Sequence, residues 1–278
     1  MSTRPIIYRT RGTTHGPITR LMSPGDLGQL LKPFVFLDLF KLKAGNGMKG
    51  FGMHPHSGIA TFTVNKDGQI AYRDTTGKSG VLQAGDVEWM RAGSGVWHGG
   101  ELMGDGAASG FQLWIALPAS EEHAPAESLY LSPEEITQAG PARVALGNYQ
   151  DAASPIPAPA GINYLDVRLA DGESWTYTPP AGHTVGWIAL DQGRVALADG
   201  DAVSEGELAV FEHGNGALSF TAQGVTSFVL GSAVPHPHEL VLGTYSVHTS
   251  ADALAKGEEG IRRIGAQLQE QERLARLP

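Results

Sequence analysis

The chain has 278 residues, 41% apolar and 18% charged, which is enough apolar material for one large domain or two of ordinary size. A formal charge of −9 argues against a general nucleic-acid-binding surface, and the lack of cysteine excludes disulfides, thiolate metal sites and a cysteine nucleophile. The N-terminus lacks an apolar signal core, and no run approaches 18 apolar residues. We therefore expect a cytoplasmic protein with no membrane span and no direct nucleic-acid binding.

The first half of the chain is predicted to be a series of short strands, because 37 glycines and 17 prolines favour turns over helices. A dense apolar run at 33–40 is typical of a buried strand. Glycine turns, such as the one at 66–68, then separate further predicted strands at 59–64, 69–73, 81–82, 87–90, 96–98 and 111–117. This spacing of roughly 8–12 residues is typical of an all-β barrel or sandwich.

A proline-rich stretch at 150–161 is a candidate linker between two domains. Strands are predicted again after it, at 164–169, 175–178, 185–190, 194–197, 207–211, 218–221 and 227–230. The segments 82–89 and 203–210 both place a Gly-acidic turn before an apolar strand, which indicates two divergent copies of one β unit. We predict an N-terminal domain at 1–150 and a C-terminal domain at 151–278.

The last segment is predicted to be helical. Ser250 can cap a helix that carries the apolar residues Leu254, Ile261, Ile264, Leu268 and Leu274. Its three glycines lower helix propensity, so we expect this helix to pack on a barrel, either unbroken or divided near Gly260.

Three histidines of the first half have the spacing of metal ligands. His54 and His56 alternate around a proline, so both imidazoles project to one face of an extended strand. His98 follows a glycine turn at 93–95, where it could arrive from a neighbouring strand. Three imidazoles would fill half of an octahedral site and leave positions open for water, oxygen or a chelating substrate.

The order of these motifs resembles the pirin family of the cupin superfamily. The similar segments are 33–38 (PFVFLD), 52–58 (GMHPHSG), 72–74 (YRD), 85–98 (GDVEWMRAGSGVWH) and 243–250 (GTYSVHTS). The resemblance implies two stacked cupin-type β-barrel domains, of which the N-terminal one alone binds a metal, usually iron. It also implies that some members cleave the flavonol quercetin with dioxygen, whereas others act in regulation through protein partners.

The resemblance further implies a metal site of three histidines and one glutamate. The histidines correspond to His54, His56 and His98, but the position of the glutamate is Gly100 here, and the nearest carboxylate is Glu101. A spacing of three residues turns a side chain to the opposite face of a strand, so Glu101 can reach the metal only if the adjacent glycines form a bulge. With that bulge we predict that Glu101 is the fourth ligand and a general base.

Three functions remain open. An iron site that chelates a flavonol would support quercetin 2,3-dioxygenase activity, with one bound transition metal, most simply Fe. Alternatively, Ser57, Ala60 and Gly100, which depart from the family pattern, favour an iron-dependent regulatory module that binds a protein partner without turnover. A cupin isomerase is the weakest alternative. We interpret His236, His238 and His183 as histidines without a metal role.

Overall fold

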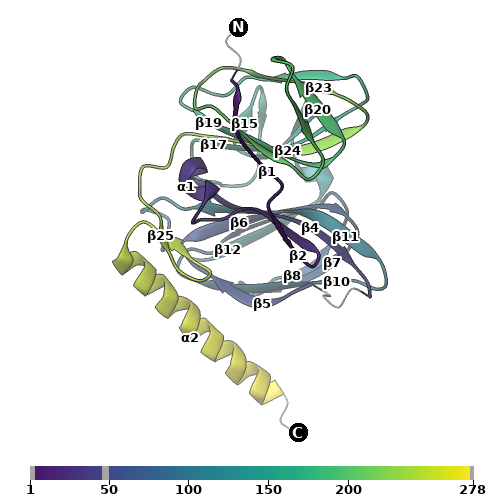
Figure 1. Ribbon diagram of the computed structural model, residues 1–278. Coiled ribbons are helices and arrows are strands. Elements are labelled where there is room, and N and C mark those ends of the chain that lie inside the picture. Colours follow the sequence, from purple (N-terminus) through teal and green to yellow (C-terminus); the bar gives the residue numbers. More distant parts are fainter. Residues whose placement is uncertain (1–3, 46–49, 276–278) are drawn as a thin grey trace.

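The computed structural model describes residues 4–45 and 50–275. Two antiparallel sheets form the first barrel, a larger one with the strand order β12-β9-β6-β11-β4-β3-β2 and a smaller one with the order β5-β10-β7-β8 (Figure 1). The bounds of these strands are β2 (Thr13–His15), β3 (Ile18–Met22), β4 (Phe34–Lys43), β5 (Gly50–His56), β6 (Ile59–Asp67), β7 (Ile70–Asp74), β8 (Ser79–Leu82), β9 (Val87–Arg91), β10 (Val96–Leu102), β11 (Ala107–Ala116) and β12 (Glu127–Leu131).

The second barrel repeats this arrangement, with a larger sheet in the order β1-β22-β19-β24-β17-β14-β13 and a smaller sheet in the order β18-β23-β20-β21. Their bounds are β1 (Ile6–Thr10), β13 (Gln138–Ala139), β14 (Ala142–Leu146), β17 (Ile162–Leu169), β18 (Ser174–Tyr177), β19 (Val185–Gln192), β20 (Arg194–Leu197), β21 (Ala202–Ser204), β22 (Leu208–Phe211), β23 (Leu218–Ala222) and β24 (Thr226–Ala233). Short ribbons and helices complete the described chain: β15 (Asn148–Tyr149), β16 (Ala152–Ala153), β25 (Val241–Leu242), β26 (Val247–His248), α1 (Leu27–Leu31), the 3-10 turn η1 (Pro133–Glu135) and α2 (Ala251–Ala275). The predicted all-β class, with two stacked barrels and a C-terminal helix, is confirmed.

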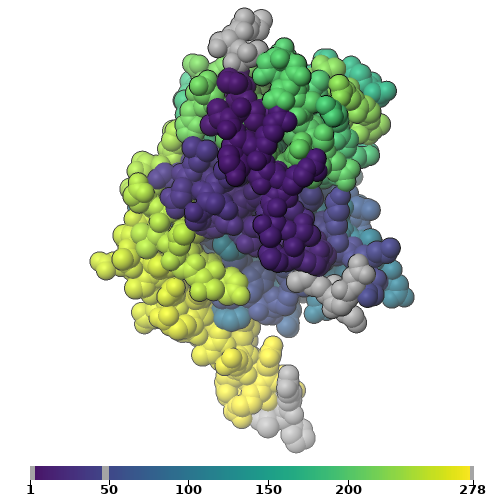
Figure 2. Space-filling model, viewed as in Figure 1, coloured from purple at the N-terminus to yellow at the C-terminus, as the bar shows by residue number. Residues whose placement is uncertain are grey.

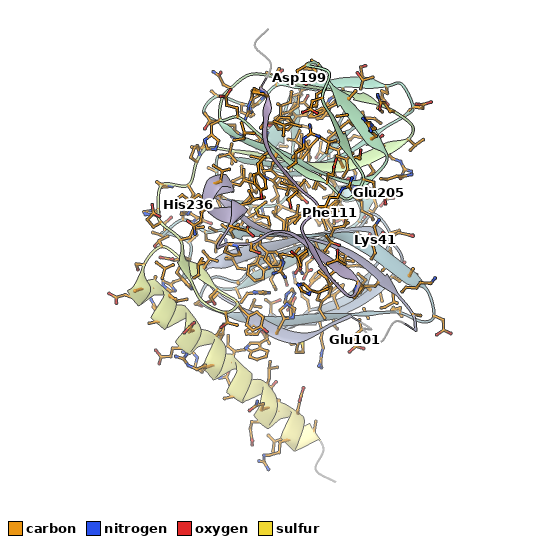
Figure 3. All side chains as sticks on the ribbon, in the orientation of Figure 1. Lys41, Glu101, Phe111, Asp199, Glu205 and His236 are labelled. Atoms are coloured by element: carbon orange, nitrogen blue, oxygen red, sulfur yellow. The ribbon has the colours of Figure 1, made fainter. Side chains whose placement is uncertain are left out.

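The two large sheets pack face to face and share one apolar core. Aromatic rings cross this interface, with Phe62 edge-on to Tyr164 at 5.5 Å and Phe34 edge-on to Trp187 at 5.4 Å between ring centroids. Phe111 lies in the same layer, between the barrels (Figure 3). Each fully buried side chain of this size stabilises the fold by about 1.5–3 kcal/mol, so the barrels support each other.

No single point in the sequence separates the strands of the first barrel from those of the second. β1 pairs with β22 of the second barrel before the chain enters the first, and β14 pairs with β17, also in the second. The N-terminal segment therefore lies across both barrels, as its purple colour shows in Figure 2. The domain boundary at residue 150 stays a prediction, because strands on its N-terminal side belong to both barrels.

The interiors of the two barrels differ in chemistry. In the first barrel Asp38, Gln112, Thr63 and Glu88 lie directly opposite one another on adjacent strands, and each is at most 9% exposed. They form a polar row that faces the smaller sheet. Apolar and aromatic side chains fill the second barrel instead. The first barrel, and not the second, therefore has an interior that suits a polar ligand site.

Helix α2 is one continuous helix that follows the short β25–β26 ribbon and packs against β5 and β10 on the outer side of the first barrel (Figure 1). Its buried residues are Gly257, Gly260 and Gly265. A Cβ at Gly260 would overlap the carbonyl oxygen of Ser94, and one at Gly265 would lie 2.8 Å from the Trp97 ring. The glycines that lower helix propensity thus permit the close packing of the helix on the barrel.

Candidate metal centre

Strands β5 and β10 bring the three predicted histidines together. His98 lies directly opposite His54 in the antiparallel pair, and Val96 lies opposite His56. Side chains alternate along a strand, so His54 and His56 share the face that His98 also occupies. The ring centroids are 4.5 Å apart for His54 and His98, 4.9 Å for His54 and His56, and 5.1 Å for His56 and His98. One ligand nitrogen of each ring lies within 4.8 Å of the others.

The Nδ1 atom of each imidazole is 2.8–3.2 Å from an oxygen outside the cluster. The acceptors are the carbonyl of Gly52 for His54, at 2.8 Å, the carbonyl of Tyr245 for His56, at 3.0 Å, and Glu88 Oε1 for His98, at 3.2 Å. Because Nδ1–H donates to these acceptors, Nε2 carries the free lone pair in each ring. Such outer contacts are typical of histidines that bind metals.

Two of these Nε2 atoms are buried without a partner. Among the described residues, neither Nε2 of His56 nor Nε2 of His98 has a hydrogen-bond partner, although the two residues are only 0% and 4% exposed. A buried polar atom without a partner costs about 1–3 kcal/mol. A cation between the rings would satisfy both nitrogens, so the residues present fit a metal ion.

The electrostatics favour neutral ligands. Burial, together with the neighbouring His98, lowers the pKa of His54 to about 4. Burial also lowers the pKa of His56 well below its ordinary value. Burial raises the pKa of Glu88, but its hydrogen bonds from His98 and Thr63 outweigh this effect and hold that pKa below the usual value. At neutral pH the site therefore offers two uncharged imidazoles beside an ionised carboxylate.

The prediction that Glu101 is the fourth ligand is not supported by its position. β10 pairs with β7 in an unbroken register from His98 to Leu102, so the glycines at 99–100 form no bulge. The irregularity lies in β5. His98 pairs with His54 and Gly100 pairs with Phe51, so β5 advances three residues while β10 advances two, and β5 carries the extra residue. Glu101 consequently points to the outer face of the sheet and is exposed (Figure 3).

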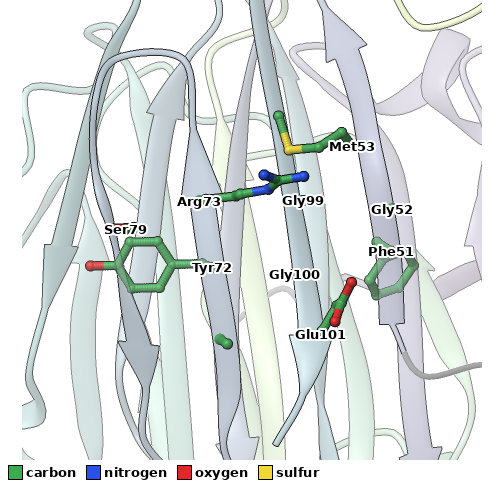
Figure 4. A pocket seen from close by; sticks show the side chains of 10 residues that line it. Phe51, Gly52, Met53, Tyr72, Arg73, Ser79, Gly99, Gly100 and Glu101 are labelled. Carbon is green, nitrogen blue, oxygen red and sulfur yellow. The ribbon is translucent and has the colours of Figure 1, made fainter. Parts of the chain in front are cut away.

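Glu101 instead lines a groove on the outside of the smaller sheet. This groove has a volume of about 360 Å³ and is also lined by Met53, Arg73 and Gly99 (Figure 4). Its charged side chains, Arg73 and Glu101, lie on the face opposite to the imidazoles.

Gly100 occupies the inward position two residues after His98. A Cβ added there would meet Ile70 Cγ2 at 3.0 Å, a tight contact, and the carbonyl of Ala71 at 3.6 Å, an ordinary one. Gly100 lines a cavity of about 30 Å³ together with His54, His98 and Glu88. The cavity is about the size of one water molecule. The three imidazoles thus have no carboxylate ligand from their own strand.

Sequence reasoning missed Glu88, which supports His98 from β9. The available signal was a carboxylate inside the apolar strand 87–91, next to two residues that face the inter-barrel core. Of the other histidines, His236 is 3.3 Å from the carbonyl of Leu117 through Nε2, and His183 Nδ1 is 3.2 Å from Ser232 Oγ. Neither is part of the three-histidine cluster.

The fold and the site define an all-β protein of two stacked barrels with a candidate three-histidine metal centre in the first barrel. A model of the family described as Pirin matches residues 17–115. A pirin-like protein of Caulobacter vibrioides is 30% identical over 71% of this chain and 76% of its own length. A Pseudomonas aeruginosa protein with the provisional name quercetin 2,3-dioxygenase is 29% identical over 79% of this chain and 81% of its own. The chain belongs to the pirin family.

Solved structures agree with this fold. A quercetin 2,3-dioxygenase from Acinetobacter baumannii superposes with a TM-score of 0.84 at 24% identity, over 94% of this chain and 98% of that one. A bacterial pirin from Escherichia coli, solved in complex with nickel(II), superposes with a TM-score of 0.66 at 19% identity, over 84% and 98%. In the described parts of the chain, no helix combines the length and apolar character needed to cross a membrane.

Proposed function

We propose that this chain binds one transition-metal ion, iron in its functional form, through Nε2 of His54, His56 and His98. The observation that carries this proposal is the pair of buried Nε2 atoms on His56 and His98, for which residues 4–45 and 50–275 offer no hydrogen-bond partner. Imidazole-rich sites accept several first-row metals, so the choice of iron follows the family resemblance.

We further propose that the metal-loaded protein acts on a flavonol as a quercetin 2,3-dioxygenase. The names of relatives support this reaction class. Bound iron would supply Lewis-acid and redox chemistry toward a chelating hydroxyl–carbonyl pair and dioxygen. The residues hold and orient the metal, and Glu88 fixes His98 from behind.

The geometry restricts how a flavonol could approach. The cavity of about 30 Å³ beside His98 is too small for a three-ring substrate. Tyr245 is 42% exposed, and its ring centroid is 6.2 Å from those of both His54 and His56. We propose that the substrate enters on this side, where the phenol ring offers a stacking surface. Glu101 has no role as a base in this arrangement, because it faces outward.

A second candidate function is a metal-dependent regulatory module that binds a protein partner without turnover. The observations in its favour are Gly100, where the family resemblance places a carboxylate ligand, and the small cavity that replaces it. Among the residues that the structure describes, the site therefore lacks a carboxylate ligand and space for a large substrate beside His98, while its three histidines stay in place.

Metal content and turnover distinguish these proposals. Tag-free protein should contain about one equivalent of iron by elemental analysis, with an electron paramagnetic resonance signal. Iron-loaded protein, incubated with quercetin without oxygen and then exposed to oxygen, should consume the quercetin absorption band. His98→Ala should abolish both results, whereas Glu101→Ala, on the outer face, should preserve them.

The outcomes separate the two functions. Iron-loaded protein with no spectral loss above the enzyme-free control would reject the dioxygenase proposal, and an iron-dependent pull-down of one partner would then support the regulatory module. A preparation that binds no transition metal would reject both.

A further inference from the structure

A second cluster of metal-ligating side chains lies outside the centre described above. Glu122 and His123 belong to the loop between β11 and β12, and His248 ends β26, with two residues between it and the start of α2. Glu122 Oε2 is 3.1 Å from His248 Nδ1, and the two imidazoles stack with centroids 5.2 Å apart and an angle of 27°. One ligand atom of each residue lies within 4.8 Å of the other two.

Hydrogen bonding within the protein leaves one atom of this cluster unsatisfied. If His248 Nδ1–H donates to Glu122, Nδ1 of His123 remains buried without a hydrogen-bond partner among the described residues. The distance of 3.1 Å also fits a different arrangement. Two ligands of one tetrahedral zinc ion, with bonds of about 2.0–2.1 Å, lie roughly 3.3 Å apart.

We propose that Glu122, His123 and His248 form a second divalent-cation site, suited to zinc, that ties the β11–β12 loop to the start of helix α2. The ligands are a carboxylate oxygen of Glu122 and Nδ1 of both histidines. Two imidazoles, one carboxylate and a water form a common four-coordinate zinc site. This site is separate from the proposed iron centre and does not depend on it.

The surrounding contacts hold the ligands in orientations that suit a cation. Thr249 donates its backbone N–H to Glu122 Oε2 at 2.8 Å and its hydroxyl to Oε1 at 2.7 Å. Nε2 of His248 is 3.0 Å from Ser57 Oγ, which is 2.8 Å from Ser246 Oγ. When Nε2–H donates to Ser57 and Ser57 donates to Ser246, the lone pair of Nδ1 is free for the metal.

The backbone around His248 is shaped to this ring. Added Cβ atoms at Gly58 and Gly257 would both overlap the His248 imidazole, so the two glycines allow the chain to enclose it. Glu122 and His248 are 4% and 2% exposed. A pre-formed, enclosed ligand pair needs little reorganisation to accept an ion.

Charge at this cluster is also compatible with metal binding. Burial raises the pKa of Glu122, but the hydrogen bonds from Thr249, together with one from His248 whenever its Nδ1 carries the proton, outweigh it and keep that pKa below its usual value. Burial lowers the pKa of His123, and the Lys256 ammonium lowers it further. Burial likewise lowers the pKa of His248 despite the neighbouring Glu122. The ligands are therefore an ionised carboxylate and two neutral imidazoles at neutral pH.

Zinc titration of the metal-free full-length chain by calorimetry tests this proposal. His54→Ala removes one half-buried ligand of the three-histidine centre and so weakens that centre. This variant should still bind one zinc ion, with an affinity that depends on His123. His123→Ala introduced into the same variant should abolish that equivalent. Zinc should also raise the melting temperature of His54→Ala by roughly 5–10 °C at a hundredfold excess over Kd.

His213→Ala, which removes an exposed histidine elsewhere, is the matched control and should leave zinc binding unchanged. If His123→Ala leaves the stoichiometry, the affinity and the thermal shift unaltered, the site is refuted. The same holds if His213→Ala weakens zinc binding as much as His123→Ala. Failure of the iron proposal would appear differently, as a wild-type chain that binds only the His123-dependent zinc.

Discussion

At the scale of single residues, the metal centre depends on the contact that each imidazole makes on its outer side. Gly52, Tyr245 and Glu88 accept hydrogen bonds from the three Nδ1 atoms, and this leaves Nε2 directed at a common point. Only one of these acceptors is charged. Glu88 should therefore affect the donor strength of His98 as well as its orientation.

Glu88→Gln should weaken metal binding by about tenfold, because the amide keeps the volume and one acceptor oxygen but loses the negative charge. A competition titration against a chromogenic chelator measures this change. Glu101→Gln makes the same substitution on the outer face and should leave the affinity unaltered. Equal affinities for Glu88→Gln and wild type would show that His98 needs no charged partner.

Gly100→Glu should strengthen metal binding by about tenfold, because it directs a carboxylate into the cavity beside His98, where a fourth ligand can form. The new Cβ meets Ile70 Cγ2 at 3.0 Å, a contact that rotation of the isoleucine can relieve. The same competition titration, with Gly100→Gln as the control for added volume, measures the effect. An affinity that rises no more for Glu than for Gln would contradict it.

At the scale of elements, sequence alternation predicted which side chains share a face but not where a strand is irregular. His54 and His56 were predicted on one face, and β5 places them there. The expectation for Glu101 required a bulge in β10, whereas the extra residue lies in β5, next to Gly52. The local sequence does not show which of the two strands carries the extra residue, because β5 and β10 both contain glycines near this point of the pairing. Glu88 was missed for a similar reason, since its partner lies on another strand.

Helix α2 shows the same limit of local reasoning. Glycine in an exposed helix costs about 1 kcal/mol relative to alanine, which predicts that Gly260→Ala stabilises the protein. In the fold the new Cβ would overlap the Ser94 carbonyl, so we expect destabilisation by about 2 kcal/mol instead. Urea unfolding of Gly260→Ala and wild type measures whether the free energy of unfolding rises or falls. Gln269→Ala, at an exposed position of the same helix, should change stability by less than about 0.5 kcal/mol. A stabilised Gly260→Ala would show that the helix is not closely packed there.

At the scale of the whole molecule, the barrels are joined by contacts between residues far apart in the sequence. The regular spacing of the predicted strands indicated two β units, but it did not predict that β1 would pair with β22, about 200 residues later. β1 exposes Ile7 and Tyr8 and has no alternating burial, so the sequence carries no signal for it. Buried charges also cross the interface: Lys66 of the first barrel contacts Asp166 of the second, which accepts a hydrogen bond from Arg143 at 3.0 Å.

This ion cluster should make stability depend on pH in one direction. Burial raises the pKa of Asp166, but Lys66 and Arg143 outweigh burial and hold it below its usual value. A carboxyl with a depressed folded pKa stabilises the protein above its unfolded pKa of about 3.9, and this contribution is lost as pH falls through the folded pKa. Asp166→Asn should therefore lower stability by about 3 kcal/mol at pH 7. In this variant Arg143 loses its carboxylate partner, and among the described carboxylates Lys66 keeps only Asp191, at 3.7 Å.

The difference in melting temperature between Asp166→Asn and wild type should be largest at pH 7 and should shrink once the pH falls below about 4. Asp201→Asn breaks an exposed ion pair with Arg9 and serves as the control, with an expected change of less than about 1 kcal/mol at either pH. A difference that stays constant from pH 7 to pH 3 would mean that Asp166 contributes through packing and hydrogen bonds alone. A shrinking difference would assign the coupling of the two barrels to buried charge as well as to the aromatic layer between them.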